Sequence, residues 1–362
     1  MKKKSTPCQE LAHRLRAQFP PLGQLVLAFD DCRIGVQSNS LALIDTLREY
    51  FSDFLSDAPA WDMLITAHEA EPPKLPHTFS TKEPDPGKNK IKEEFVDLAD
   101  GRLVRKRLTG MVFVFGGDDS LAVGPCLANA NQVINFINNR FISWKLRQGC
   151  LLGHAAGIGL QGCGLALAGF SGMGKSTLAL HLMSRGTDFI SNDRVLLRKD
   201  PAGLFMYGVA KLPRINPGTA LNNPDLAGVI PPQDRERFTG LAPEALWNLE
   251  HKYDVFLDHC FGPGRFALAA SMAGLVILNW QRGPAATVVR EVDIRQRRDL
   301  LPAFMKSAGL FFLPEHGEEI DHSEKAYLKR LVKTRVYEIS GTIDFDLACE
   351  ACLEILAECR NR

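Results

Sequence analysis

The sequence predicts an α/β protein of two domains, with a P-loop domain in the C-terminal part and an α+β domain before it. Residues 169–176, GFSGMGKS, fit the pattern G-x-x-x-x-G-K-[ST] of a phosphate-binding loop. An apolar run at 165–168 precedes this loop and a helical pattern at 177–183 follows it, which is the strand–loop–helix context of the motif. The length of 362 residues suits two domains, and a hydrophobic content of 45% supplies their cores.

Composition and charge exclude several classes of protein. A net charge of +1 gives no case for binding nucleic acid or an anionic membrane, and no apolar run is long enough for a transmembrane helix. The basic residues 102–107 are read as a solvated strand face. Nine scattered cysteines without an apolar signal segment predict reduced thiols and a cytoplasmic protein, and Cys349 and Cys352 are read as an apolar helix face.

The N-terminal domain is expected to span residues 1–148, and its pattern points to no catalytic residues. Five prolines between positions 72 and 86 predict a mobile loop over about 71–90, because proline interrupts regular structure. Asp100-Gly101 between two strand-like runs predicts a hairpin turn. The other expected elements are a helix over 9–19, strand material over 24–36, a helix capped at Asn39-Ser40 with Ala42, Leu43, Leu47 and Phe51 on one face, strands at 63–65 and 111–115, and a helix over 129–145.

The C-terminal domain is expected to span residues 149–362. Its periodicity predicts the strand and helix on either side of the P-loop, a strand that begins near 189, buried strands at 275–278 and 336–341, and a final helix over 345–356. This alternation of strands and helices is typical of an α/β domain.

The residue types of the P-loop explain how it would bind ATP with Mg²⁺. Glycines permit positive φ, so that successive N–H groups turn toward a phosphate, and the N-terminus of the following helix adds to the attraction. Lys175 supplies a charge for the β- and γ-phosphates, and the Ser176 hydroxyl is placed to bind Mg²⁺. The expected nucleotide-binding residues are Gly169, Phe170, Ser171, Gly172, Met173, Gly174, Lys175, Ser176 and Thr177.

Two further candidate site residues lie on either side of the loop in the sequence. His154 ends a strand-like run fifteen residues before Gly169, and Asp193 lies seventeen residues after Ser176. In a parallel sheet, the strand that begins near 189 can lie beside the P-loop strand, which would bring Asp193 to the phosphates.

These residues resemble the HPr kinase/phosphorylase family, whose catalytic domain has the phosphoenolpyruvate carboxykinase nucleotide-binding fold. The family motif R-G-H-x-L-V-A-D-D-x-V is similar to residues 185–195, RGTDFISNDRV. The resemblance implies that Asp193 is the general base toward an acceptor hydroxyl, that His154 is the family histidine, and that Lys175 and Ser176 bind the phosphates and Mg²⁺.

The resemblance covers roughly residues 150–300, and the group it most resembles is HprK-related kinase B. Residues 252–254 are similar to the K-x-Y-D segment and residues 263–265 to the P-G-R segment, so Arg265 is a candidate catalytic cation. Members of this group are associated with an ATP-grasp partner, which the resemblance therefore implies. A homo-oligomer is a further expectation of the same kind.

The departures from the family pattern change the expected site. Asn192 replaces the first aspartate of the pair, no carboxylate lies in residues 211–216 where the family has its metal-binding glutamate, and Val255 replaces an arginine. Metal binding is then expected from Ser176, Asp193 and the phosphates themselves. Arg214 or Arg265 would replace the lost cation.

The leading interpretation is an ATP-dependent kinase that phosphorylates a hydroxyl on a protein serine or a small molecule. Two alternatives stay open, namely a nucleotide-binding regulatory or assembly module without acceptor chemistry, and a simple NTPase. His154 could equally be a packed, hydrogen-bonded histidine, and Asp193 a metal ligand with no role as a base. The identity of the acceptor does not follow from these motifs.

Overall fold

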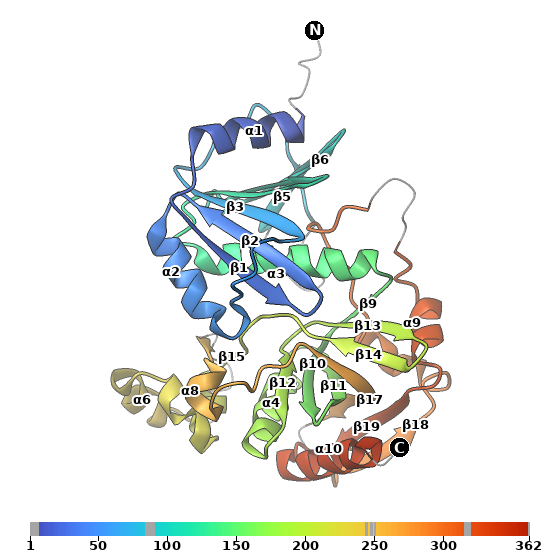
Figure 1. Ribbon diagram of the computed structural model, residues 1–362. Helices are drawn as coiled ribbons and strands as arrows, with labels where there is room; N and C mark the ends of the chain where they lie inside the picture. Colours follow the sequence, from blue (N-terminus) through green and yellow to red (C-terminus); the bar gives the residue numbers. More distant parts are fainter. Residues whose placement is uncertain are drawn as a thin grey trace. The chain divides into compact units, whose positions relative to one another are not determined.

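The computed structural model shows a mixed α/β protein with several sheets (Figure 1). It describes residues 7–83, 91–242, 245–246, 249, 251–281, 283–314 and 320–360. The chain divides into two compact units: unit 1 comprises Met1–Trp144 and Ala308–Glu319, and unit 2 comprises Lys145–Ser307 and Ile320–Arg362. The domain boundary after residue 148 stays a prediction, since this division ends unit 1 at Trp144 and returns residues 308–319 to it.

In the described part of unit 1, one sheet of eight strands forms the framework. β1 and β2 are antiparallel, and so are the neighbouring strands from β4 through β8. β3 runs parallel to both β2 and β8. In spatial order the strands are β1 (Gly23–Phe29), β2 (Cys32–Ser38), β3 (Met63–Glu69), β8 (Asp119–Gly124), β7 (Val112–Gly116), β6 (Gly101–Lys106), β5 (Glu93–Leu98) and β4 (Ser80–Thr81).

Helices cover both faces of this sheet, as the side chains of β7 show. Successive strand residues point to opposite faces. Val112 and Val114 pack in one cluster with α1 (Cys8–Gln18), while Phe113 lies 4.9 Å from Phe136 of α3 (Ala130–Arg147), ring centroid to centroid. Figure 1 shows α1 and α3 on these opposite sides. The remaining helical elements of unit 1 are α2 (Leu41–Tyr50) and η1 (Ser52–Phe54).

Most expected elements of the N-terminal half are confirmed. The hairpin at Asp100-Gly101 joins β5 to β6, and the Ser40 side chain caps α2 by accepting a hydrogen bond from the Leu43 amide at 3.2 Å. Two details are wrong: Ala42 is exposed and Ile44 takes its place on the buried face, and the segment 71–90 contains β4, which pairs with β5. Residues 84–90 of that segment lie outside the described residues.

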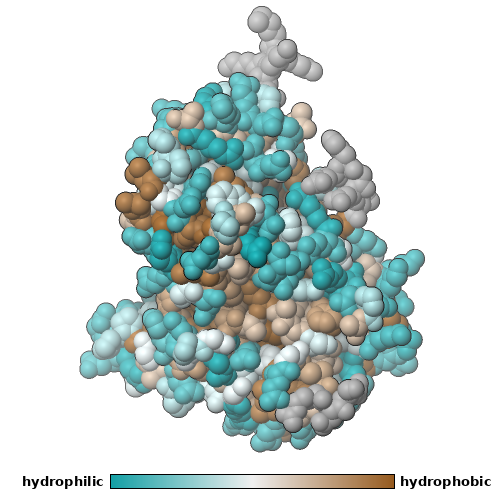
Figure 2. Space-filling model, viewed as in Figure 1, coloured by the Kyte–Doolittle hydropathy of each residue, from teal (hydrophilic) through white to brown (hydrophobic). Residues whose placement is uncertain are grey.

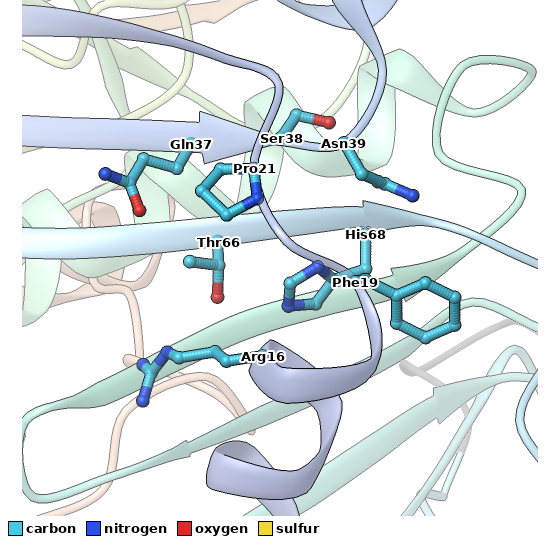
Figure 3. A pocket seen from close by; sticks show the side chains of 8 residues that line it. All are labelled: Arg16, Phe19, Pro21, Gln37, Ser38, Asn39, Thr66 and His68. Carbon is cyan, nitrogen blue, oxygen red and sulfur yellow. The ribbon is translucent and has the colours of Figure 1, made fainter.

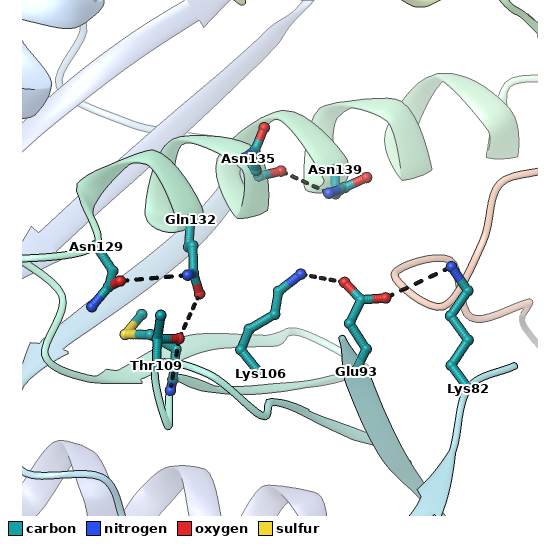
Figure 4. Close-up of polar contacts among 9 residues, drawn as sticks. Lys82, Glu93, Lys106, Thr109, Asn129, Gln132, Asn135 and Asn139 are labelled. Atoms are coloured by element: carbon teal, nitrogen blue, oxygen red, sulfur yellow. Dashed lines mark hydrogen bonds and ion pairs between the residues drawn. The ribbon is translucent and has the colours of Figure 1, made fainter. Parts of the chain in front are cut away.

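The basic residues of β6 are neutralised by acidic residues of β5. Glu93 pairs with Lys106 and lies 3.8 Å from the ammonium of Lys82 (Figure 4). Arg105 pairs with Glu94 on the same two strands. The expectation of a solvated strand face therefore needs a refinement, because its charges are satisfied across the sheet.

Unit 2 is built on a second sheet, in which nine strands lie within the described residues. β17 is its long central strand, with β11 along one side and both β14 and β19 along the other. The order is β12 (Asp188–Ser191), β10 (Ala155–Leu160), β11 (Cys163–Gly169), β17 (Ala269–Trp280), β14 (Gly203–Tyr207), β13 (Val195–Asp200) and β9 (Leu151–Gly153), with β19 (Arg335–Gly341) beside β17 and β18 (Val288–Val292) beyond it.

The strand β11 is buried over its whole length, which explains its continuous apolar sequence. The helices α4 (Lys175–Ser184) and α10 (Phe345–Arg360) pack together against it on one face. Ala166 and Ala168 belong to the core cluster of the other face, with Phe304 and Tyr327. Smaller elements are the strands β15 (Arg214–Ile215) and β16 (Tyr253–Asp254), and the helices α5 (Pro217–Leu221), η2 (Pro224–Val229), α6 (Pro232–Thr239), α8 (Leu257–Phe261), η3 (Arg298–Ala303) and α9 (Glu324–Leu331).

One pair of cysteines corrects the expectation of reduced thiols. Cys163 at the start of β11 and Cys359 near the end of α10 form a disulfide, with Cα atoms 6.4 Å apart. Their sequence separation of 196 residues gave no signal of this proximity, which arises because α10 packs along β11. Cys349 and Cys352 are fully buried free thiols on α10, as expected for an apolar helix face.

Reduction of this disulfide is expected to destabilise the protein. A cross-link restricts the unfolded chain and is typically worth about 2–4 kcal/mol, so reductant should lower the unfolding midpoint of the wild type. Cys359→Ser should unfold at that lower temperature and no longer respond to reductant, while Cys260→Ser, which removes a half-buried free thiol, should respond as the wild type does. Calorimetry with and without reductant checks this, and equal wild-type midpoints would contradict it.

The face of the molecule drawn in Figure 2 carries both hydrophilic and hydrophobic areas. In the view of Figure 2 most of the surface is hydrophilic, and an apolar patch lies over α2 of unit 1. Leu22 and Leu41 are among the exposed large hydrophobic residues of this unit. None of the helices in the described ranges is both long enough and apolar enough to cross a membrane.

Candidate nucleotide-binding site

The loop between β11 and α4 has the backbone conformation that phosphate binding needs. Gly172 and Gly174 have φ values of 85° and 81°, which side-chain-bearing residues rarely adopt. A Cβ atom on Gly174 would also lie 3.0 Å from the Phe345 ring. The strand, the glycine loop and the start of α4 at Lys175 thus occur in the order that the motif requires.

The Lys175 ammonium lies inside the loop. Its Nζ donates hydrogen bonds to the Gly169 carbonyl at 2.7 Å and to the Phe170 carbonyl at 3.3 Å, and the residue is 8% exposed. Burial lowers the pKa of Lys175, the charge of Asp193 acts to raise it, and Lys306 lowers it further. An ammonium that burial destabilises gains from the approach of an anion, because a phosphate would supply the missing negative charge.

Aromatic residues of β17 and α10 support the loop through a hydrogen bond and ring contacts. The Trp280 indole N–H donates to the Met173 carbonyl at 2.9 Å, and Trp280 packs edge-on against Phe345. Phe345 also stacks on His181 of α4. The P-loop is therefore fixed by the buried core of unit 2 and not only by its own glycines.

His154 and Asp193 form an ion-pair contact in the same unit. The His154 Nε2 lies 3.1 Å from the Asp193 Oδ1, and the two side chains are 21% and 47% exposed. His154 joins β9 to β10, and its backbone N–H donates to the Phe304 carbonyl at 2.7 Å. The structure thus brings together two residues that are 39 positions apart in the sequence.

Asp193 lies in a tight turn and not within a continuous strand as the sequence pattern suggested. β12 ends at Ser191 and β13 begins at Val195. The Ser191 hydroxyl donates to the Arg194 carbonyl at 2.5 Å and accepts from the Val209 amide at 3.2 Å, so that it closes the turn. A second expectation is also wrong, because β12 pairs with β10 and does not lie beside the P-loop strand β11.

Several cations influence the Asp193 carboxylate. Burial would raise its pKa, but the hydrogen bond and charge of His154, together with the charges of Lys306 and Arg194, lower it to about 2. Asp193 in turn acts on the pKa of Lys175 and of Lys211. One carboxylate among several cations gives this part of the molecule a surplus of positive charge, which suits a polyanion such as a nucleoside triphosphate.

Lys306 is the residue of this cluster that sequence analysis missed. Its charge acts on both Asp193 and Lys175, so it belongs to the same electrostatic cluster. The Tyr327 hydroxyl fixes its backbone by accepting from the Lys306 amide at 3.0 Å, and the same oxygen lies 3.0 Å from the Lys306 carbonyl and 2.5 Å from that of Leu152. A bridge between Gly153 and Met305 completes this anchor. No motif surrounds Lys306, so only the fold reveals it.

The arginines proposed from sequence have other partners. Arg265 pairs with Asp188 at 2.9 Å and donates a hydrogen bond to the Thr187 carbonyl, so it is held at the start of β12. Asp193 follows the opposite end of the same strand. Arg214 lies 3.2 Å from Asp254, the last residue of the K-x-Y-D-like segment. Val255, where the family has an arginine, is fully buried.

The residues predicted to bind Mg²⁺ carry oxygen ligands, as a cation that arrives with a nucleotide would require. Among the residues that the structure describes, no group of three or more His, Cys, Asp or Glu side chains is arranged to hold a metal ion. Mg²⁺ is commonly bound by one or two protein oxygens together with phosphates and waters. The Ser176 hydroxyl and the ionised Asp193 carboxylate are ligands of this kind.

The chain is a mixed α/β protein whose second unit carries a candidate phosphate-binding loop. No family model matches the chain, and no curated protein matches it either. A solved structure of the Hpr(Ser) kinase/phosphatase from Coxiella burnetii is similar over 58% of this chain and 90% of its own, at 14% identity and a TM-score of 0.29. With a TM-score this low, the assignment of the site depends on the residues described above.

The ion pair of Asp193 predicts a specific pH dependence of stability. A carboxyl group whose pKa is lowered by folding stabilises the folded state above its unfolded pKa of about 3.9, and this contribution disappears as the pH falls toward about 2. Because the side chain is half exposed, we expect at most about 1 kcal/mol. The difference in unfolding midpoint between wild type and Asp193→Asn should stay constant from about pH 5 to 8 and shrink below about pH 4. A difference that grows on acidification would contradict it.

Proposed function

We propose that the protein is an ATP-dependent kinase related to the HPr kinases, which transfers the γ-phosphoryl group to a hydroxyl acceptor. The observation that carries this proposal is the electrostatic link between the P-loop and an acid–base pair. Asp193, hydrogen-bonded to His154, acts on the pKa of Lys175 inside the loop, and Lys306 acts on the pKa of both. A P-loop NTPase uses such a carboxylate to hold Mg²⁺, whereas transfer to an alcohol also gains from a base, and we propose the base role because His154 contacts this carboxylate at 3.1 Å.

In this mechanism, Lys175 and the loop amides hold the β- and γ-phosphates, and Mg²⁺ neutralises part of their charge when it is bound. The oxygen of the acceptor hydroxyl bonds to the γ-phosphorus, and the bond from that phosphorus to the ADP oxygen breaks. Asp193 accepts the proton that this hydroxyl loses. The transition state of phosphoryl transfer is loose, so that little proton transfer is needed early. A carboxylate that is ionised before the reaction and takes the proton late therefore suffices, although the low pKa of Asp193 makes it a weak base.

His154 and Lys306 complete the proposed set. The 3.1 Å contact with His154 orients the Asp193 carboxylate, so we propose that His154 is a positioning residue. We assign to Lys306 the cationic role that the family gives to an arginine, because Val255 is buried and Arg265 is engaged by Asp188. Positive charge near the γ-phosphate stabilises the transferring group.

Label transfer from γ-labelled Mg-ATP tests the proposed function. The protein is incubated with a desalted protein extract of the host in one reaction and with the small-molecule fraction in another. Label on a protein or metabolite with wild type, and none with Asp193→Asn, would establish a kinase and the class of its acceptor. Free phosphate without acceptor would identify an NTPase, and bound nucleotide with neither outcome would identify a nucleotide-binding module.

Replacement of Lys306 should slow transfer more than it weakens ATP binding. We expect Lys306→Met to lower kcat by about 10²-fold, as for other groups that stabilise charge in the transition state, with a small change in the KM for ATP. Lys306→Arg should restore part of the rate because it keeps the charge. Lys325→Met is the matched control, since Lys325 is an exposed lysine on α9. A kcat unchanged in Lys306→Met would remove Lys306 from the mechanism.

A further inference from the structure

A small cavity in unit 1 lies beyond the end of α1, the helix that covers part of one face of the sheet. It is lined from three sides, by the end of α1 and the segment after it, by the end of β2, and by β3 (Figure 3). The helix α1 packs against β6, β7 and β8, and it ends at Gln18. Phe19 and Pro21 continue over β2 and β3, where they leave a cavity of about 60 Å³.

Four polar groups at this cavity have no hydrogen-bond partner within the described residues. They are the Arg16 Nε, the Thr66 Oγ1 and both ring nitrogens of His68. Thr66 and His68 are 3% and 2% exposed, and they point to the same face of β3 because they are two residues apart. Figure 3 shows the three side chains around one hollow. Burial of a polar group without a partner is unfavourable, so this arrangement calls for a ligand.

The character of these groups indicates the head group of that ligand. Three of the four groups can donate, namely the Arg16 Nε–H, the Thr66 hydroxyl and one N–H of His68, while the second ring nitrogen of neutral His68 accepts, so the ligand must offer mostly acceptors. Arg16 also carries a charge, which its ion pair with Asp119 at 2.5 Å offsets in part. Burial, and to a smaller extent the charge of Arg16, lower the pKa of His68 to about 4, so its ring is neutral and offers one donor at neutral pH.

Size and the remaining lining indicate the rest of the ligand. Water could satisfy the polar groups, but Phe19 and Pro21 also line the cavity, and water does not need their apolar surface. A carboxylate accepts several hydrogen bonds and gains from a charge-assisted one with arginine. We propose that this cavity binds a small aliphatic monocarboxylate, with its oxygens toward Arg16, Thr66 and His68 and its short chain against Phe19. The site belongs to unit 1 and is independent of the proposed kinase activity.

Saturation-transfer NMR on the full chain tests this proposal with propionate as the probe and propionamide, its uncharged analogue, as the comparison. We expect a saturable signal from propionate and an affinity for propionamide that is at least about tenfold lower, since hydrogen bonds to a charged group are the stronger ones. Equal binding of the two probes would overturn the carboxylate assignment. No signal from either would show that the cavity holds water only.

Two variants and one control locate the binding. Thr66→Val keeps the shape of the side chain and removes a hydroxyl that has no partner in the described residues, so it should abolish propionate binding without lowering the unfolding midpoint. Arg16→Met should abolish it as well. Arg14→Met changes an exposed arginine on the same helix and should bind propionate as the wild type does. Propionate binding that survives in Thr66→Val would overturn the proposal.

Discussion

Asp193→Asn is expected to lose phosphoryl transfer and keep ATP binding. A positioned base contributes about 10²- to 10⁴-fold to the rate, and the amide cannot accept the proton of the acceptor hydroxyl. ATP affinity should stay equal or rise, because the substitution removes a negative charge that acts on Lys175. The folded state should change little, since the pair with His154 is half exposed. Single-turnover transfer and equilibrium ATP binding, measured on the same preparation, check the two halves separately.

A carboxylate from the same part of the fold provides the control. Asp188→Asn removes the partner of Arg265 at the start of β12, and transfer should stay within a few-fold of wild type. The alternative role of Asp193 as a metal ligand gives a different result. If Asp193 only held Mg²⁺, a higher Mg²⁺ concentration should restore much of the activity of Asp193→Asn, whereas a missing base is not replaced by metal. Equal loss of binding and transfer would sink the base assignment.

Local sequence signals predicted the P-loop, but they do not account for every residue of the candidate site around it. The glycine pattern fixes the backbone between β11 and α4, so Lys175 and its loop lie where the motif places them. Asp193 was proposed because its distance from the loop resembles a family pattern, although the strand before it ends at Ser191 and pairs with β10. Lys306 carries no local signal, because only the packing of residues 304–306 against 152–154 brings it to the site.

Long-range pairing explains the other failures as well. The disulfide between Cys163 and Cys359 depends on the packing of α10 along β11. The arginines proposed as cations were chosen from motif position alone, and the structure gives Arg265 to Asp188 and Arg214 to Asp254. Charged residues within a motif can form ion pairs with residues that are distant in the sequence. A single sequence contains no information on those partners.

Lys175→Met is expected to lose ATP binding while the protein becomes no less stable. Hydrogen bonds to a charged group are worth about 1.5–3 kcal/mol, so ATP affinity should fall by about 10- to 10²-fold and transfer should fall further. Burial lowers the pKa of Lys175, which means that the charged form is disfavoured in the folded state. Methionine has a similar length without the charge, so the unfolding midpoint without nucleotide should equal that of the wild type or exceed it.

Weaker ATP binding together with an unfolding midpoint that does not fall would show that the Lys175 charge serves function and not stability. If the hydrogen bonds from Lys175 to the carbonyls of Gly169 and Phe170 held the loop together, the methionine variant would unfold at a lower temperature. If the ammonium is retained for the nucleotide, ATP at a concentration near the wild-type Kd should raise the midpoint of the wild type by linkage and that of the variant far less. Midpoints of both proteins, with and without Mg-ATP, decide between the two. A variant that is destabilised yet still responds to ATP would remove Lys175 from the proposed binding site.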